Sequence, residues 1–402
     1  MQVDLAIIGG GIAGSALALV LARQGLDIAL IEREATFRDR VRGEAIHPWG
    51  TREVDRLGLR QLIVEDAAGS ELPTWQTYRQ RMPQDPFEWA SIDPSVPPEL
   101  TVRHPVLQEC LFTAAAAAGT RVFRPATVSL DRDRRGPLVS IQQDQSTITL
   151  SPRFIVGADG SHSMTRKWMG GRAERDPVHH YFGGTLVSGL HMPPHAAHQA
   201  IGEGGFGMIF PQTGQLSRVY LICTPEQRQA MTGSPQPATM MEQVASFLPE
   251  GMIGEWKAAG PTAFFPNADI VSSLIAAPQA DGVLIGDAAG TNDPSSGHGL
   301  SLVFRDVRIL SDMLLGDQAW NRIPAAFAAE RTQYFNVVRA HARWNARLIA
   351  ESGPEADALR EQVARAREID PTAGGFAAIY ALGPDGLDTS EAARRHFFGE
   401  DC

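Results

Sequence analysis

The sequence contains few cysteines and hardly any lysine. Its three cysteines, Cys110, Cys223 and Cys402, are an odd number, lie far apart and form no C-x-x-C pair. This pattern argues against a disulfide framework, a thiolate zinc site and a redox disulfide that passes electrons, and it predicts a cytoplasmic protein. Lysine occurs only at Lys167 and Lys257, so arginine supplies almost all the positive charge.

Positive charge as a whole is outnumbered. The 36 Lys and Arg residues face 46 Asp and Glu residues, which gives a net charge of −10. Because binding to phosphate backbones needs a basic field, we expect no nucleic-acid partner. Long uninterrupted apolar runs are also missing: four glycines break up residues 3–22, and no basic segment or cleavage site frames them. A soluble protein with no membrane partner is therefore predicted.

What the sequence does contain is a β-α-β pattern at its start. Residues 3–8 read as a buried strand, 13–23 as an Ala/Leu helix ended by Gly25, and 27–32 as a second buried strand. The length of 402 residues suits about two domains.

Later segments indicate a second kind of architecture. A helix is expected at 106–118 and buried strands at 153–157 and 282–286, whereas residues 180–275 alternate with a period of two, as in an antiparallel sheet. A helix is expected from Gly299 to Leu315, and residues 323–402 read as mostly helical. Residues 72–102 are rich in proline and aromatic side chains, which predicts an excursion from the first core.

The turn Gly9-x-Gly11-x-x-Gly14 lies between the first strand and helix, and Glu32 ends the second strand. Such glycines permit a tight turn and bring a pyrophosphate close to the helix N–H groups, while the acid accepts a hydrogen bond from an adenosine ribose. A carboxylate would repel a 2′-phosphate, so FAD or NAD is expected here rather than NADP.

A second glycine pattern, Gly202-x-Gly204-x-x-Gly207, serves as a control. It lies within alternating strand sequence with no helix after it, so its glycines are predicted to be bends or bulges.

Two further segments close buried strands: Gly157-Ala-Asp-Gly160 and Gly286-Asp287, the latter leading through Pro294 to Gly297-His-Gly299-Leu300. With the early glycine turn, their order and spacing resemble those of the FAD-dependent oxidoreductases with the para-hydroxybenzoate hydroxylase fold. The resemblance covers about residues 1–345.

The resemblance implies an α/β fold with a Rossmann-like FAD-binding domain, an inserted antiparallel β-sheet substrate domain and a helical C-terminal region. The expected boundaries are residues 1–71, 103–172 and 276–322 for the FAD-binding domain, 73–102 and 173–275 for the substrate domain, and 323–402 for the C-terminal region.

The resemblance also implies the roles of individual residues. Asp287 would accept the ribityl hydroxyls, the helix start at Gly297–Leu300 would face flavin N1 and C2=O, and Pro294 would stiffen the loop. The residues expected to contact FAD are Gly9, Gly11, Ile12, Ala13, Gly14, Glu32, Arg33, Arg42, Ala45, Arg103, Val128, Asp159, Asp287, Pro294, Gly297, Gly299 and Leu300.

Two of these assignments leave alternatives open. Arg42 begins an R-G-E segment similar to that of the halogenase-like and reductase-like branches, where it would face the cofactor. Either Arg103 or His104 should reach FAD, and Arg103 is favoured because a guanidinium binds phosphate in a bidentate manner. The sequence departs from the common G-D-A-A-H pattern, since Gly290 stands in place of the histidine.

His47 and His298 lie near the predicted flavin-contacting segments and are candidate catalytic acid–base groups, although structural roles remain the main alternative. His191, His195 and His198 have helix-like metal spacing, but Pro193 and Pro194 rule out a regular helix there. No metal site is predicted.

The function that the resemblance implies is an NAD(P)H-using monooxygenase. It would transfer one oxygen atom from O₂, through a flavin C4a-hydroperoxide, to an aromatic or polyketide-like small molecule. Three alternatives stay open: a carbon–carbon double-bond reductase of the geranylgeranyl-reductase-like type, a flavin halogenase, and a non-catalytic FAD-binding sensor. A halogenase lacks support, because no lysine follows the R-G-E segment and no W-x-W-x-I-P is present.

Overall fold

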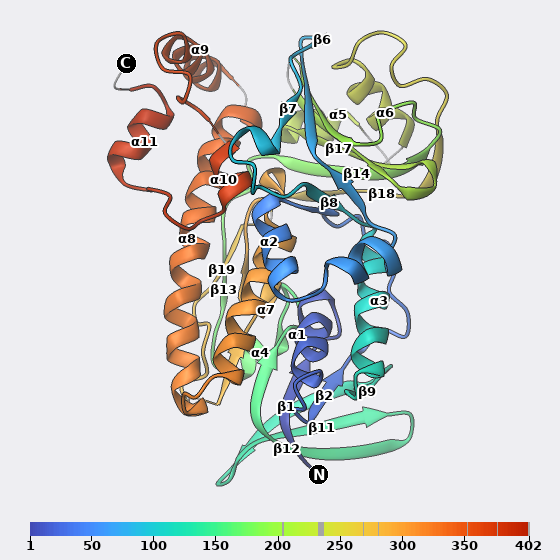
Figure 1. The fold of residues 1–402 in the computed structure, drawn as a ribbon, viewed down its shortest axis with the longest axis vertical. Coiled ribbons are helices and arrows are strands. Elements are labelled where there is room, and N and C mark those ends of the chain that lie inside the picture. Colours follow the sequence, from blue (N-terminus) through green and yellow to red (C-terminus); the bar gives the residue numbers. More distant parts are fainter. Residues whose placement is uncertain are drawn as a thin grey trace.

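The computed structural model describes residues 1–202, 205–231, 237–267, 269–279, 281–351, 353–375 and 377–400. Gly204 of the second glycine pattern and Cys402 lie outside the described residues. Within the described part the chain is a mixed α/β structure built on two large sheets. The N-terminus lies at the opposite end of the molecule from the second sheet and the C-terminal helices (Figure 1).

The first large sheet has β1 (Gln2–Ile8) at its centre, between β12 (Ser146–Gly157) and β2 (Ile28–Ile31). These strands are parallel, as are the outer β9 (Arg121–Phe123) and β20 (Gly282–Leu284). Alternate residues of β1 pack into different hydrophobic cores. Leu5 and Ile7 belong to the core on one face of the sheet, and Ala6 and Ile8 belong to the core on the other. Burial on both faces explains why this strand is a continuous apolar run.

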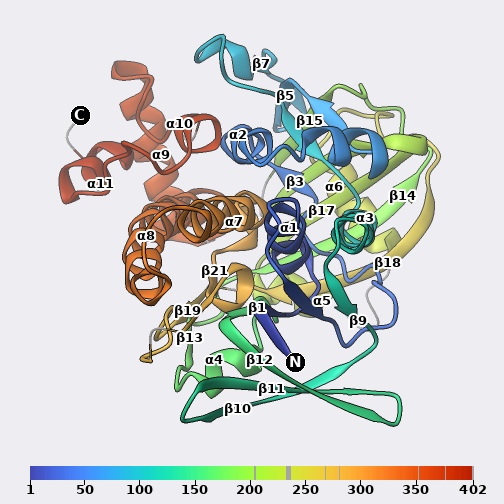
Figure 2. The same ribbon diagram turned by 60° about the horizontal axis from the view of Figure 1, so that its bottom comes forward.

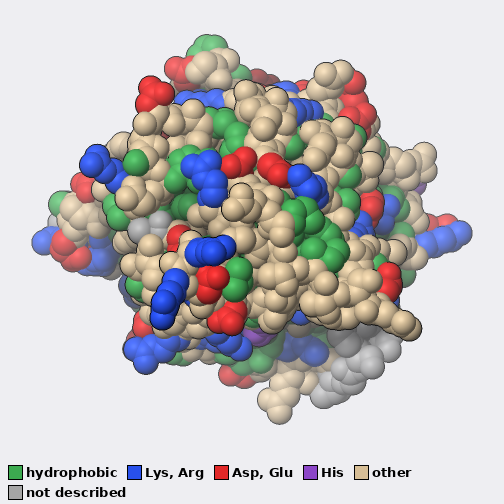
Figure 3. All heavy atoms as spheres, turned by 90° about the horizontal axis from the view of Figure 1, so that it is seen from below, with side chains coloured by type: hydrophobic (Ala, Val, Ile, Leu, Met, Phe, Trp, Pro, Cys, Tyr) green, Lys and Arg blue, Asp and Glu red, His purple; other side chains and the backbone are tan. Residues whose placement is uncertain are grey.

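An antiparallel ribbon extends this sheet at the N-terminal end of the molecule (Figures 1 and 2). It consists of β10 (Thr127–Asp133), β11 (Gly136–Gln143) and the first half of β12. Acidic and basic side chains are interspersed on the face seen in Figure 3, which shows no continuous basic patch.

Helices cover the first sheet. α1 (Ile12–Ala22) packs against α3 (His104–Ala117) and α7 (Gly299–Leu315), and α7 in turn packs against α8 (Ile323–Ile349), as Figure 1 shows. The expected helices and buried strands of this region are confirmed to within a few residues. The short α4 (Met164–Trp168) follows β12.

The second large sheet has the order β18-β14-β17-β16-β15-β5-β6, with β7 paired to β5. Its strands are β5 (Thr74–Arg79), β6 (Met82–Pro83), β7 (Phe87–Glu88), β14 (Tyr181–Ser188), β15 (Ala196–Gly202), β16 (Gly205–Gln212), β17 (Leu216–Cys223) and β18 (Lys257–Pro266). The expected antiparallel pairing holds except between β5 and β15, which are parallel. No tight hairpin sets the direction of two strands so far apart in the sequence.

The second glycine pattern lies in the β15–β16 hairpin of this sheet. A side chain at Gly202 or Gly205 would meet the ring of Phe247 within 2.5 Å. The described glycines of the pattern therefore belong to paired strands and not to a nucleotide turn, but Gly207 keeps regular register in β16 and does not form the predicted bend or bulge. The local role of Gly202 and Gly205 is to make room for Phe247. Helices α5 (Pro225–Ala230) and α6 (Pro237–Ala245) belong to the same region.

Residues 72–102 do leave the first core, because β5, β6 and β7 form one edge of the second sheet. The chain returns through β8 (Glu99–Thr101), which pairs with β3 (Ala45–Ile46) and β4 (Ser70–Leu72) in a small sheet. Another small sheet joins β13 (Ala173–Arg175), β19 (Ile270–Ser272) and β21 (Gly290–Thr291).

The C-terminal region is helical, as expected. After α8 come α9 (Pro354–Ile369), α10 (Ala377–Leu382) and α11 (Glu391–Phe397). α10 packs against α2 (Pro48–Arg56), which follows the R-G-E segment (Figure 2). None of the described helices is both long enough and apolar enough to cross a membrane.

Candidate functional site: a cofactor cleft opening into an apolar chamber

A cavity of about 1090 Å³ runs from the β1–α1 turn, past the carboxyl ends of the first sheet, to the second sheet. Ligands of open α/β sheets bind at this edge, because loops from several strands converge there. Most of the residues predicted from sequence line this cavity. They include Ile12, Ala13, Arg33, Ala45 and Val128 in addition to those discussed below.

The Gly9–Gly14 turn needs its glycines for packing reasons that the structure makes explicit. Gly9 has φ +106°, and a Cβ there would lie 2.4 Å from the carbonyl oxygen of Ala158. A Cβ on Gly14 would lie 1.9 Å from the Gly9 carbonyl oxygen. The first contact joins the early glycine turn to the Gly157–Gly160 segment, so two of the three motifs are one structural unit.

Gly11 differs, because space remains beside it. A Cβ there would meet nothing closer than Gln108 Nε2 at 3.8 Å, and Gly11 is the N-cap of α1 with no side-chain cap. The first N–H groups of α1 are thus left for a ligand at the cavity wall. Glu32, which is buried, accepts hydrogen bonds from Gly10 N and Glu34 N at 2.7 Å each. These bonds fix its carboxylate beside the turn.

Asp287 follows β20 and lines the cavity next to α1, since a Cβ on the preceding Gly286 would lie 3.1 Å from that of Ala13. Its carboxylate has one ionic partner among the described residues, Arg42 at 3.9 Å, and about two fifths of its side chain is exposed. A carboxylate with so few protein partners suits a hydroxyl-rich ligand. The Gly9–Gly14 cradle, the uncapped α1 and this free carboxylate together fit FAD.

The start of α7 completes the cleft. Pro294 opens a short turn that ends at Gly297, which has φ +67°, and His298 is the N-cap of α7 with no side-chain cap. A Cβ on Gly297 would lie 2.8 Å from His47 Nε2. Gly299 and Leu300 then line the cavity, with the positive end of the helix directed to this side. At Gly290, the position that departs from the G-D-A-A-H pattern, φ is +141° and a Cβ would crowd the Ile270 carbonyl.

Asp159 lines the cavity, but its carboxylate is committed elsewhere. It accepts hydrogen bonds from Ser163 Oγ at 2.5 Å and from Thr165 N and Oγ1 at 2.9 and 3.0 Å. These bonds tie it to the start of α4, so a cofactor contact at this position falls to the surrounding backbone.

The preference for Arg103 over His104 does not agree with the structure. His104 lines the large cavity, and its Nδ1 lies 3.0 Å from the Gly43 carbonyl oxygen. Arg103 lines a separate surface pocket with Val106 and Glu109 instead. Arg103 is the N-cap of α3 in extended conformation, and its side chain leaves the backbone away from the cleft that His104 lines.

His47 contacts the cavity but has both ring nitrogens engaged. Nδ1 lies 2.7 Å from Glu99 Oε1, and Nε2 donates to the Ser296 carbonyl oxygen at 2.9 Å. Glu99 is fully buried and also accepts from Trp75 Nε1 at 2.6 Å. In this geometry His47 positions the Ser296–Gly297 loop. Neither the contact of His47 with Glu99 nor that of Glu99 with Trp75 was predicted, because β8 and β5 come together beside His47 only through the tertiary fold.

His298 lies behind the cavity wall rather than on it. Its Nδ1 accepts from Trp49 Nε1 at 3.3 Å, and its ring stacks on Tyr380 at 5.1 Å between centroids. Burial, together with the charges of His47 and His341, holds the pKa of His298 well below its ordinary value. A neutral, enclosed imidazole suits packing better than proton transfer to a substrate.

A buried ion pair anchors the R-G-E segment. The Glu44 carboxylate accepts two hydrogen bonds from the Arg218 guanidinium of β17, at 2.9 and 3.0 Å. It also accepts hydrogen bonds from Gln212 Nε2 and from the backbone N–H of His104. Burial alone lowers the pKa of Arg218, but the hydrogen bonds and charge of Glu44 raise it overall. This network joins the first domain to the second sheet, and the alternating pattern of β17 gave no sign of a buried arginine.

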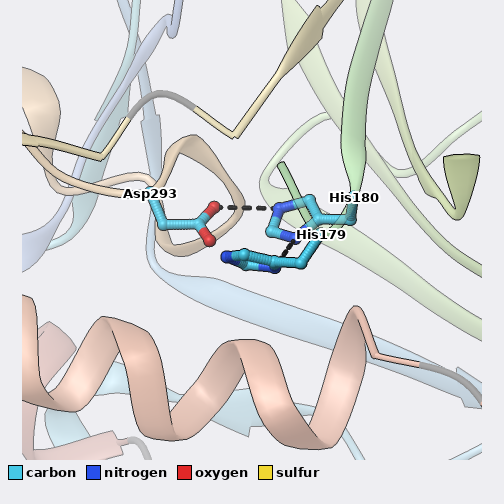
Figure 4. Close-up of side chains that lie close together, drawn as sticks. All are labelled: His179, His180 and Asp293. Carbon is cyan, nitrogen blue, oxygen red and sulfur yellow. Dashed lines mark hydrogen bonds and ion pairs between the residues drawn. The ribbon is translucent and has the colours of Figure 1, made fainter. Parts of the chain in front are cut away.

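One group of described residues has metal-ligand chemistry: His179, His180 and Asp293, shown in Figure 4. His180 Nε2 lies 3.1 Å from Asp293 Oδ1, and its Nδ1 lies 2.8 Å from His179 Nδ1. An ion bound through both Nε2 atoms would leave two protonated Nδ1 atoms facing each other at that distance. The geometry therefore favours a hydrogen-bonded chain, and the absence of a metal site stays a prediction.

Comparison with known proteins gives this cleft a family. The FAD-binding domain family matches residues 2–334, which is most of the chain. The chain belongs to this family. The Gly9–Gly14 turn, Glu32 and Asp287 all fall within the matched region, so FAD is the cofactor that the cleft serves.

Individual relatives are distant. Squalene epoxidase 3 of Arabidopsis thaliana is 25% identical over 327 residues, which cover 78% of this chain and 60% of that protein. The chain thus spans about three fifths of the length of that relative. A menaquinone reductase of Mycolicibacterium smegmatis is 24% identical, over 78% of this chain and 76% of its own. Among solved structures, Pseudomonas aeruginosa PqsL in complex with 2-aminobenzoylacetate superposes with a TM-score of 0.72. It is 19% identical and covers 87% of this chain and 97% of its own, so it shares the fold.

Proposed function

We propose that the protein is an FAD-dependent monooxygenase that uses NAD(P)H and O₂ to oxidise an aromatic or polyketide-like small molecule. The observation that carries this proposal is the continuity of the cavity, which leads from the cofactor cleft into a chamber lined by apolar and aromatic side chains. When bound, FAD supplies the redox chemistry, taking reducing equivalents from NAD(P)H and activating O₂. The squalene epoxidase relative supports oxygen chemistry, and the PqsL complex supports a small aromatic ligand.

The chamber walls suit exclusion of water. Phe206, Met208 and Phe210 of β16 point to one side of the strand and line the cavity. Tyr220 of β17 contacts Phe210 at 6.0 Å between ring centroids. Such a wall holds an apolar substrate while keeping water away from the reaction.

The polar elements of the chain have separate tasks. The uncapped start of α7 would stabilise negative charge on a cofactor bound in the cleft that Gly299 and Leu300 line. His47, fixed by Glu99, holds the loop that precedes this helix. The unpaired Cys110 and Cys223 agree with a reducing, cytoplasmic location.

The second candidate is a flavin-dependent carbon–carbon double-bond reductase, which the menaquinone reductase relative favours. Both enzymes need the same FAD cleft and an apolar chamber, so the cavity alone does not separate them. The use of oxygen does.

The test begins with aromatic and polyketide-like compounds screened for stimulation of NAD(P)H consumption by the holoprotein. For a monooxygenase, the best compound is expected to cause near-equal consumption of O₂ and NAD(P)H, and its product to carry one atom from ¹⁸O₂. Equal product formation without oxygen, with two hydrogens gained instead of labelled oxygen, would replace this proposal by the reductase.

A further inference from the structure

The far end of the chamber carries positive charge. Trp75, Thr77 and Arg79 alternate along β5 and all line the cavity, whereas Tyr78 points to the other face and is buried in the core. Trp75 lies at the His47 end, because its ring stacks on Tyr380 and donates to Glu99. Arg79 is four residues farther along, at about 13 Å for an extended strand.

A second arginine comes from the C-terminal region. Arg367 of α9 lines the cavity and donates to the carbonyl oxygens of Ala373 and Gly374 at 2.7 and 2.5 Å. α10, which follows that loop, places Tyr380 and Ala381 against Trp75 and Trp89. The C-terminal helices therefore form one wall of the chamber in addition to packing on α8.

Neither arginine has a carboxylate partner among the described residues. The Arg79 side chain makes no hydrogen bond or ion pair with them, and the Arg367 side chain donates only to carbonyl oxygens. The Arg79 side chain reaches solvent and that of Arg367 is half-buried, so both stand at the open end of the cavity. Partial burial lowers the pKa of Arg79, and partial burial followed by the charge of Arg79 lowers that of Arg367. Several other arginines of the same cavity are paired: Arg42 with Asp287, Arg331 with Asp306 and Arg360 with Asp357. Arg38 also lines the cavity without a carboxylate partner among the described residues, but it follows Phe37 near the cofactor cleft rather than lying on β5 or α9.

We infer that Arg79 and Arg367 bind the anionic end of the substrate, which is an elongated, largely apolar molecule with a carboxylate at one end. The two guanidinium groups repel each other in a partly enclosed wall. An anion bound between them would relieve this repulsion and accept charge-assisted hydrogen bonds from both. The apolar body of such a substrate lies between Trp75 and the β16 side chains, and its uncharged end reaches the cofactor cleft. The inference rests on the proposed function, since it assigns the ligand of that chamber.

The test compares acids with their own amides. The FAD-loaded protein is titrated with 2-naphthoate, 2-naphthamide, 4-phenylbutanoate and 4-phenylbutanamide, with the flavin spectrum as readout. We expect each acid to bind at least tenfold more tightly than its amide, because a charged hydrogen bond is lost in the amide. Arg79→Met and Arg367→Met should each weaken acid binding about tenfold or more and leave amide binding unchanged.

Arg365→Met is the matched control. It removes the same charge from the same helix, but Arg365 is exposed and pairs with Glu361 at 3.7 Å. Arg79→Met is the more reliable variant should Arg367→Met disturb the 373–374 loop, and FAD content and Tm report that disturbance.

Four results would overturn the inference. The first is equal binding of acid and amide, the second is equal binding of an acid by wild type and Arg79→Met, and the third is no binding of either acid up to 10 mM. The fourth is a raised KM for NAD(P)H in both variants with acid binding unaltered, which would assign the arginines to the dinucleotide. Because these titrations need no turnover, they stand apart from the oxygen-labelling test of the monooxygenase.

Discussion

The acidic residues of this cleft differ in how many protein groups bind their carboxylates. Glu32 and Asp159 are held by protein hydrogen bonds, whereas the Asp287 carboxylate has only a distant arginine partner. A carboxylate that faces a cofactor site with one long ionic contact and no hydrogen bond from the described residues is available for the ligand, and its removal costs binding more than folding.

We therefore expect Asp287→Ala to weaken FAD binding by roughly 1.5–3 kcal/mol, which is about ten- to more than a hundredfold in Kd. The reason is the loss of the charged acceptor for the ribityl hydroxyls. Titration of the apoprotein with FAD measures it. Asp312→Ala, which removes an exposed acid of α7 outside the cavity, should leave Kd unchanged. Wild-type affinity in Asp287→Ala would place the ribityl chain elsewhere.

The packing of whole elements explains why the Gly9–Gly14 turn tolerates few substitutions. The β1–α1 turn has to bring the first N–H groups of α1 to the cleft while passing within contact distance of the Ala158 backbone. Two of its glycines meet other backbone atoms, and one faces open space at the cavity.

This contrast yields opposite expectations for two substitutions of the same type. Gly14→Ala places a Cβ 1.9 Å from a backbone oxygen, so it should lower Tm by several degrees and abolish FAD binding. Gly11→Ala has room in the protein and should keep the Tm of the FAD-free form within about 2 °C, yet weaken FAD binding, because its methyl group occupies the path of the pyrophosphate.

Thermal unfolding with and without FAD, followed by far-UV circular dichroism, distinguishes the two. If Gly11→Ala retained full FAD affinity, the pyrophosphate would not lie at the start of α1.

At the scale of the whole molecule, the two sheets are joined by buried polar contacts as well as by apolar packing. Glu44 and Arg218 link the R-G-E segment to β17, and His198 and His298 are imidazoles buried in different regions. Buried groups of this kind make stability depend on pH.

The direction of this pH dependence follows from the depressed pKa values of His198 and His298, for which burial is the largest cause. Below about pH 6.5 these histidines become protonated in the unfolded chain but stay neutral in the folded protein. The free energy of unfolding therefore falls as the pH drops from 6.5 towards 5. Each such histidine contributes up to about 1.4 kcal/mol per pH unit. Urea unfolding at pH 7.5, 6.5, 5.5 and 5.0 should show this loss.

His198→Gln should reduce that slope, because it removes one of the five histidines whose pKa is depressed mainly by burial. The others are His104, His179, His298 and His341. His396→Gln, an exposed position, is the control and should leave the slope unaltered. An identical slope in wild type and His198→Gln would contradict the assignment.

The sequence by itself determined the parts that depend on local pattern. Periodicity predicted the buried strands and the helices of the first domain, and three ordered glycine motifs predicted the FAD cleft, because backbone conformations and close approaches impose residue types at fixed spacings. The same logic correctly separated the Gly202–Gly207 strands from a nucleotide turn.

Only the tertiary structure decided which distant residues meet. It chose His104 over Arg103 at the cavity, gave His47 its partner Glu99, and set β5 parallel to β15. It also brought Arg367 to the same chamber as Arg79, from segments nearly 300 positions apart. Contacts of this kind depend on how separate elements pack, and no local spacing records them. The cofactor could therefore be predicted from the sequence, whereas the substrate chamber became visible only in the fold.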